Sequence, residues 1–161
     1  MPLAEIRIDD ATWDAASPER RSEWKQALAE LMEEHRIEAE EKLKLMVSVE
    51  GSNVVLDART VDGRPHSRIE LPFQSLSPHF QEYFDIVRDM GKTGQNDQSP
   101  RIEALDIAKR IAHDEAAETL LKLCSPLRPD HATCRRLFTL LVTLHFDTTR
   151  LILPHHRREK R

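Results

Sequence analysis

Residues 43–71 read LKLMVSVEGSNVVLDARTVDGRPHSRIEL, and this stretch carries the clearest fold signal in the chain. Two dipeptides that favour tight turns, Gly51-Ser52 and Asp62-Gly63, divide it into three runs in which apolar and polar residues alternate. Alternation with a period of two indicates a strand with one buried face, and a glycine-containing dipeptide between such runs is typical of a hairpin turn. The stretch therefore predicts three consecutive antiparallel strands.

The two turns also predict the register of these strands. Paired positions across a hairpin keep a constant sum, so a turn at Gly51-Ser52 places Val49 opposite Val54. The other predicted pairs are Val47 with Leu56, Leu45 with Ala58, Thr60 with Pro65, Ala58 with Ser67, Leu56 with Ile69, and Val54 with Leu71. One face is then apolar, and a slip of one residue would bury the charged face. That opposite face carries Lys44, Ser48, Asp57, Arg59 and Arg68.

Two further features complete the predicted sheet. Pro65 directly follows the second turn, and because proline cannot donate a ladder hydrogen bond, its strand is expected at an edge. A short apolar segment at residues 6–8 is expected to add a fourth strand. The prediction is a short antiparallel meander of three to four strands.

Outside this region the apolar periodicity is helical. The predicted helices begin at Ser17-Pro18, Ser77-Pro78, Ser99-Pro100 and Asp130, where a capping residue precedes an apolar repeat. The first is expected to end near residue 38 and the second at Gly91 or in the polar loop that follows. Pro126 and Pro129 separate the last two helices. The fold class is therefore α+β, with about four helices packed on the apolar face of the sheet.

Length and composition favour one domain. The chain has 161 residues, of which 39% are hydrophobic and 32% charged, enough for one core and too few for two ordinary domains. We expect a single α+β domain over residues 1–146 and a basic, flexible tail over residues 147–161. The net charge of -4 is far from the strongly basic balance of nucleic-acid-binding domains, so nucleic acid is an unexpected partner.

Compartment and redox state follow from what the sequence lacks. No apolar run approaches the roughly 20 residues of a membrane helix, and the first ten residues do not resemble a secretory signal. We therefore expect a cytoplasmic protein that does not enter a membrane. Cys124 and Cys134 lie near or within apolar segments without a close-spaced partner, so two reduced, packed thiols are expected.

One helical stripe is the main candidate site. At 100° per residue, Glu103, Asp106, Arg110 and His113 fall within about 80° of one another. A functional interpretation makes Arg110 an anion clamp, His113 a general base, and Glu103 or Glu115 its orienting carboxylate. The favoured structural interpretation makes Asp106 and Arg110 an i,i+4 pair on a solvated face, worth about 0.3 kcal/mol.

The last predicted helix contributes two arginines and a histidine. Arg135 and Arg136 lie near its start, where cations oppose the helix dipole, so a carboxylate partner from residues 103–115 is expected. His145 lies in the apolar sector of this helix. If it faced His113, the two would suggest a metal or proton-transfer pair, but a packed core histidine is the expected outcome. We predict no metal site and no cofactor.

Four segments together resemble a known family. They are PRIEALDIAKRIAHDE at residues 100–115, DHATCRRLFTLLVTLH at 130–145, LDARTVDG at 56–63 and EYFDIV at 82–87. With them the chain resembles uncharacterised protein family 0262, small alphaproteobacterial proteins whose activity is unassigned, over about residues 5–146. The candidate residues Glu103, Asp106, Arg110, His113 and Glu115 all match the family pattern. Asp114 departs from it, because an asparagine is usual there.

The resemblance implies a fold and a lineage but no activity. The sequence contains no nucleophile elbow, dinucleotide-binding glycine pattern or metal-ligand cluster, so catalysis is not expected. We predict a non-catalytic interaction or regulatory module with a protein partner, and a homo-oligomer stays open. One alternative is a small enzyme or anionic-ligand binder that uses the 103–113 stripe. Another is RNA or ribosome association through the basic tail.

Overall fold

The computed structural model describes residues 3–92 and 100–146, and within them the strands form one four-stranded sheet. The strands are β1 (Leu3–Ile8), β2 (Leu43–Glu50), β3 (Asn53–Thr60) and β4 (Pro65–Pro72), in the spatial order β1-β2-β3-β4. The meander β2-β3-β4 is antiparallel as predicted, and Pro65 lies on an edge strand. β1 is the expected fourth strand, but it pairs with β2 in parallel, so the sheet is mixed. A parallel neighbour requires a crossover, and the helical segment between β1 and β2 provides it.

The predicted register is confirmed in the first hairpin and in most of the second. Val49 pairs with Val54, as expected for a turn at Gly51-Ser52. Val47 with Leu56, Leu45 with Ala58, Val54 with Leu71, Leu56 with Ile69, and Ala58 with Ser67 are also confirmed. The predicted pair of Thr60 with Pro65 is wrong, because Pro65 lies opposite Arg59 at a bulge.

The geometry of the second turn explains that exception. The Thr60 N–H donates to the Arg64 carbonyl at 2.9 Å, and the Gly63 N–H donates to the Thr60 carbonyl at 2.9 Å. Three residues therefore lie in the loop rather than two, with Gly63 in the left-handed region at a φ of 93°. The extra residue is absorbed by the bulge, which returns the apolar side chains to the same face.

The helices are α1 (Asp10–Asp14), α2 (Pro18–Glu33), α3 (Phe73–Lys92), α4 (Pro100–Leu123) and α5 (His131–His145) within the described residues, with a short 3-10 helix at Ser125–Leu127. The predicted caps are present: the Ser17 hydroxyl accepts from the Arg20 N–H at 3.2 Å, and the Asp130 carboxylate accepts from the Thr133 N–H at 2.8 Å. The α1 turn was not predicted. The expected cap at Ser99 lies outside the described residues.

Two predicted helix boundaries are wrong. α2 ends at Glu33, short of residue 38, because the chain then runs to Ile37, which forms an isolated bridge with Pro129. α3 begins at Phe73, so Pro78 lies inside it rather than at its start. Phe73 directly follows β4 and is buried, and its N–H donates to the Ser52 carbonyl at 3.0 Å. This anchor starts the helix before the Ser-Pro signal.

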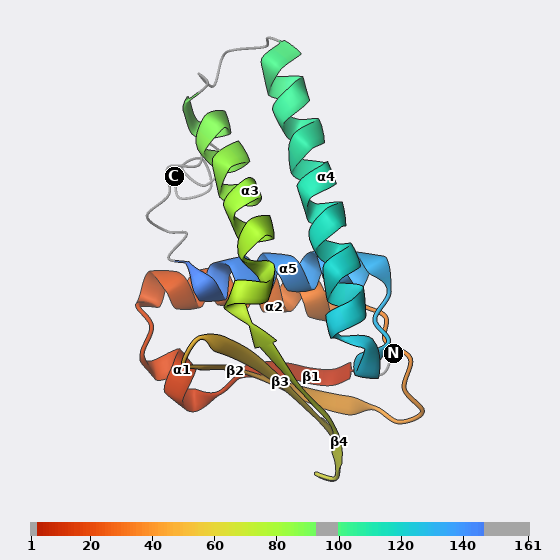
Figure 1. The fold of residues 1–161 in the computed structure, drawn as a ribbon. Coiled ribbons are helices and arrows are strands. Elements are labelled where there is room, and N and C mark those ends of the chain that lie inside the picture. Colours follow the sequence, from red (N-terminus) through yellow and green to blue (C-terminus); the bar gives the residue numbers. More distant parts are fainter. Residues whose placement is uncertain (1–2, 93–99, 147–161) are drawn as a thin grey trace.

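The molecule is layered (Figure 1). α2 and α5 lie over one face of the sheet, while α3 and α4 stand across α5 and extend away from the sheet. The predicted four helices are therefore on the same side of the sheet, but α3 and α4 pack mainly on each other and on α5. None of the helices in the described residues combines the length and the apolar character that crossing a membrane would require.

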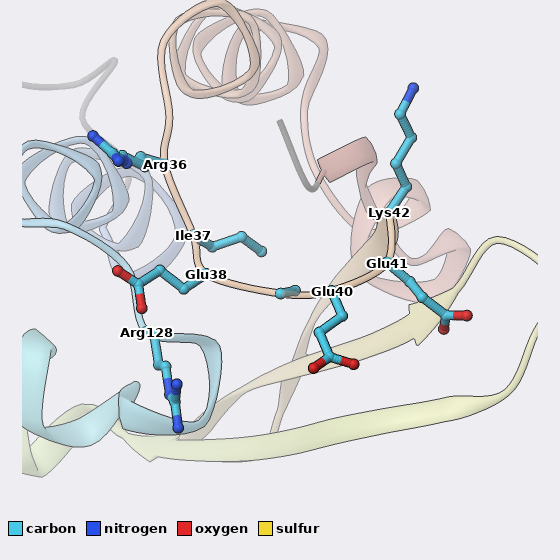
Figure 2. A pocket seen from close by; sticks show the side chains of 8 residues that line it. Arg36, Ile37, Glu38, Glu40, Glu41, Lys42 and Arg128 are labelled. Atoms are coloured by element: carbon cyan, nitrogen blue, oxygen red, sulfur yellow. The ribbon is translucent and has the colours of Figure 1, made fainter.

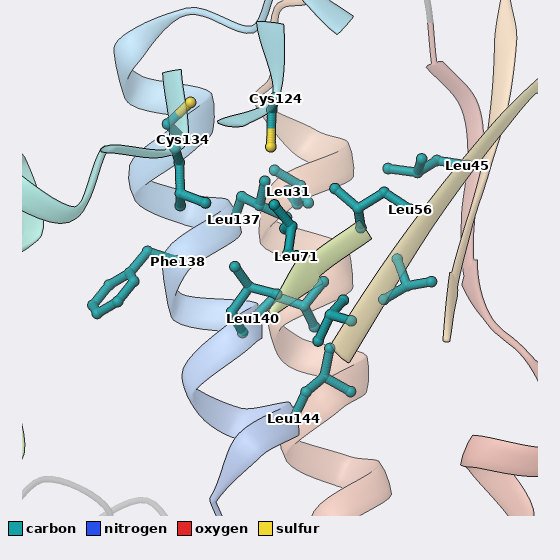
Figure 3. Close-up of a cluster of buried hydrophobic side chains, with 14 of the residues drawn as sticks. Leu31, Leu45, Leu56, Leu71, Cys124, Cys134, Leu137, Phe138, Leu140 and Leu144 are labelled. Carbon is teal, nitrogen blue, oxygen red and sulfur yellow. The ribbon is translucent and has the colours of Figure 1, made fainter. Parts of the chain in front are cut away.

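The buried side chains of the described residues form one hydrophobic cluster between the sheet and the helices. Figure 3 shows Leu45 and Leu56 of the sheet facing leucines of α5, with Leu31 of α2 beside them. Cys124 and Cys134 are free and buried in this cluster, and burial raises the pKa of each thiol to about 12. The prediction of two reduced, packed thiols is confirmed.

Candidate functional site

The two halves of α4 differ in exposure. Its buried residues, Ala112, Ala116, Ala117 and Leu120, all belong to the C-terminal half, which packs against α3 and α5. The N-terminal half extends beyond α5 (Figure 1). The stripe residues Glu103, Asp106 and Arg110 lie on this half and are exposed, as is Glu115 further along. The structure thus places these three stripe residues in solvent, apart from His113.

His113 is the stripe residue that enters the protein. Its ring packs edge-on against Tyr83 and Phe138, with centroid distances of 5.1 and 5.5 Å. Its Nδ1 lies 3.2 Å from the Lys109 carbonyl, an acceptor, so Nδ1 carries the hydrogen and donates it. Burial lowers the pKa of His113, and the nearby Lys109 and Arg135 charges act in the same direction. Its orienting group is therefore a backbone carbonyl of its own helix, where the sequence suggested Glu103 or Glu115.

His113 and His145 belong to one aromatic cluster but do not pair. His145 packs on Phe73 and Phe80, at centroid distances of 4.0 and 5.1 Å. Phe80 stacks on Phe138 at 5.5 Å, so two phenylalanine rings stand between the two imidazoles. The full cluster contains every phenylalanine and the single tyrosine of the sequence: Phe73, Phe80, Tyr83, Phe84, Phe138 and Phe146. In residues 3–92 and 100–146, no three His, Cys, Asp or Glu side chains gather as metal ligands.

The ion pairs of α5 follow the predicted network in part. Arg135 pairs with Asp114, which is the α4 carboxylate next to His113. Arg136 instead pairs with Glu34, at the end of α2. The departure of Asp114 from the family's usual asparagine therefore adds a charge that contacts α5. Both pairs are partly exposed, so each is worth about 0–1 kcal/mol.

A small open cavity of about 230 Å³ lies beside His113. Its lining is His113, Ala132, Arg135, Arg136 and Thr139. Two arginines and an imidazole would suit an anion. This cavity was not predicted from the sequence, although the four-residue spacing of Arg135 and Thr139 places both on one face of α5. However, Asp114 and Glu34 already balance the two guanidinium groups. The cavity therefore offers little net positive charge to a ligand.

A second cavity, of about 510 Å³, lies along the connection between α2 and β2. Residues 36–42 and Arg128 line it. Figure 2 shows that its charged side chains, among them Glu38, Glu40 and Lys42, point in different directions rather than toward a common centre. Glu41 is engaged elsewhere, by Arg64 at 2.9 Å. The arrangement lacks the convergence of polar groups that a small-molecule site requires.

The most unusual surface feature is apolar. Ile107 and Ile111 of α4 are 53% and 49% exposed, and with Val61 they are the large hydrophobic residues exposed in the described part of the chain. They are four residues apart, so they lie on the same face of the helix. The sequence did not predict the exposure of Ile107 and Ile111, because periodicity alone does not say how far a helix extends beyond its neighbours.

These features define a small α+β protein with a mixed sheet, a covering helical layer and a projecting helix pair. The model of the uncharacterised protein family UPF0262 matches residues 1–147, and the chain belongs to this family. A UPF0262 protein of Jannaschia sp. (strain CCS1) is 32% identical over 160 residues, covering 91% of this chain and 98% of the relative. One of Dinoroseobacter shibae is 30% identical over 161 residues, covering 89% and 97%. No solved structure matches the chain.

The family resemblance predicted from the four sequence segments is thereby confirmed. A more distant UPF0262 relative, from Sphingopyxis alaskensis, is 26% identical over 152 residues, covering 89% of this chain and 92% of the relative. These relatives come from alphaproteobacteria, as expected. The basic tail lies outside the described residues.

Proposed function

We propose that this protein is a cytoplasmic, non-catalytic interaction or regulatory module whose docking surface is the exposed face of α4. The observation that carries the proposal is the exposure of Ile107 and Ile111 on the part of α4 that extends beyond α5. Burying apolar surface is the main driving force of protein association. Two neighbouring isoleucines that are exposed on one helix face provide apolar surface that a partner could bury.

The opposite face of α4 packs against the rest of the protein. Ala112 and Ala116, which are buried, lie about 140° and 180° around the helix from Ile107. The docking face therefore points away from α3. Glu103 and Arg110 flank it on one side, and both are exposed. An apolar centre with a charged rim is the usual anatomy of a protein interface.

The surroundings of His113 support a binding role over a catalytic one. The imidazole donates to its own helix and packs against aromatic rings, and Arg110 lies among the exposed residues of α4. A general base needs an orienting partner and room for a substrate proton within hydrogen-bond reach. The ion-balanced cavity beside His113 does not supply a clear position for such a substrate.

The test compares the natural chain with two variants. All three are purified untagged from the natural host, and native mass spectrometry measures the mass of each intact assembly. Ile107→Gln/Ile111→Gln removes the apolar face while keeping good helix formers. Val61→Gln is the matched control, since Val61 is 54% exposed but lies in the turn between β3 and β4. We expect an assembly heavier than one chain, which the double variant loses and the control keeps. The free energy of unfolding of both variants should lie within about 1 kcal/mol of that of the natural chain.

A natural chain that carries no added protein mass would contradict the proposal. So would an assembly that the double variant retains in full.

A further inference from the structure

We infer that the occupant of the α4 docking face is the same face of a second copy of this chain, packed antiparallel about a two-fold axis near residues 105 and 106. The inference rests on the proposed function and adds the identity of the partner. It follows from the spacing of the apolar residues, from the order of the charges beside them and from the position of α4 in the fold.

The apolar residues have the spacing of a helix-packing seam. Pro100, Ala104, Ile107 and Ile111 are separated by four, three and four residues, which places them within about 60° of one another on the helix. A seam with this alternation packs against another helix with the same alternation. The small Ala104 leaves room for Ile107 of a second copy, and a two-fold axis creates this contact twice.

The same two-fold rotation brings opposite charges beside the seam together. Glu103 and Arg110 lie on one side of the seam, about 20° apart around the helix. When Ala104 faces Ile107 of the second copy, the antiparallel arrangement brings Glu103 beside the second copy's Arg110, and symmetry repeats the pair. Self-complementarity of this kind is the requirement for an isologous two-fold interface.

The fold leaves space for this arrangement. Among the described residues, α4 has no buried side chain before Ala112, and its N-terminal half extends beyond α5 (Figure 1). An axis near the middle of that half places the bodies of the two copies at opposite ends of the paired helices. Because the contact spans only about three helical turns, it belongs with small, reversible interfaces, below about 1,200 Å². The dimer should therefore depend on protein concentration.

The experiment is sedimentation equilibrium of the full chain over a range of concentrations, with charge variants. Glu103→Arg and Arg110→Glu each place like charges together at two symmetric positions, and each should weaken the dimer about tenfold. The double variant Glu103→Arg/Arg110→Glu restores both pairs with reversed sign and should return the dissociation constant to within about twofold of the natural chain. Glu82→Arg, an exposed charge on α3, is the control and should have no effect.

A chain that stays monomeric at every concentration would overturn the inference, as would a dimer that the single variants do not weaken or the double variant does not restore. Suppose that the purified chain is monomeric, but that the protein from the natural host forms an assembly which Ile107→Gln/Ile111→Gln loses. The second-copy inference then fails, and the proposed interaction module stands. If neither assembly exists, both fail.

Discussion

His113 illustrates how burial sets the chemistry of one side chain. Its pKa is lowered from the ordinary value of 6.5, first because burial disfavours the charged imidazolium. The folded protein therefore favours the neutral ring. The resulting contribution to the free energy of unfolding is fully present above the unfolded-state pKa and is lost as pH falls through the lower, folded-state pKa.

We expect the loss of stability between about pH 7 and about pH 5 to be smaller in His113→Gln than in the natural chain. Urea unfolding at both pH values measures this difference. Some dependence should remain, because burial also lowers the pKa of His145. His66→Gln, at an exposed position on β4, is the control and should keep the natural dependence. An unchanged pH dependence in His113→Gln would show that the folded protein tolerates the charged ring.

The two hairpin turns determine the register of the meander, and their glycines differ in backbone conformation. Gly63 has a φ of +93° and Gly51 a φ of +63°, and a Cβ at either position would meet nothing within 4 Å. Any cost of substitution is therefore conformational. Asparagine adopts the left-handed region near +57° readily, but a φ near +93° suits glycine alone.

We expect Gly63→Ala to lower the free energy of unfolding by about 1–2 kcal/mol. Gly51→Asn should change it by less than about 0.5 kcal/mol. Thermal unfolding of both variants, compared with the natural chain, tests the difference. Equal effects of the two substitutions would mean that the second turn can relax to a different loop, with loss of the bulge at Pro65.

Across the whole molecule, stability should be unevenly distributed. The sheet and α5 share one buried cluster, whereas the buried residues of α4 begin only at Ala112. Backbone amides in regions with few buried contacts exchange through local opening, at a lower free energy than global unfolding. We expect amides of residues 104–110 to exchange at least about tenfold faster than those of β3 and of residues 137–142.

Native-state hydrogen exchange by NMR measures this directly, at a low protein concentration where α4 has no second copy. Uniform protection of α4 along its length would contradict the expectation. It would mean that the helix pair α3 and α4 opens only with the rest of the protein.

The local alternation and turn residues were sufficient to predict the meander. The turn residues set the register, and a slip of one residue would bury the charged face whatever surrounds the sheet. The caps at Ser17 and Asp130 were predictable for the same reason: a side chain within three residues satisfies the orphan amides of a helix start. The family, carried by contiguous segments such as residues 100–115, was also readable directly.

Contacts between distant segments decided the rest. β1 pairs in parallel because α2 returns the chain across the sheet, and α3 begins early because Phe73 is anchored to the loop at Ser52. Helical periodicity assigns each residue of α4 an angle around the helix axis. Whether Glu103, Ile107 and His113 meet solvent or protein depends instead on where α3 and α5 end beside α4. Burial is a property of neighbours far away in the chain, so periodicity assigns a residue to a face and only packing determines what covers that face.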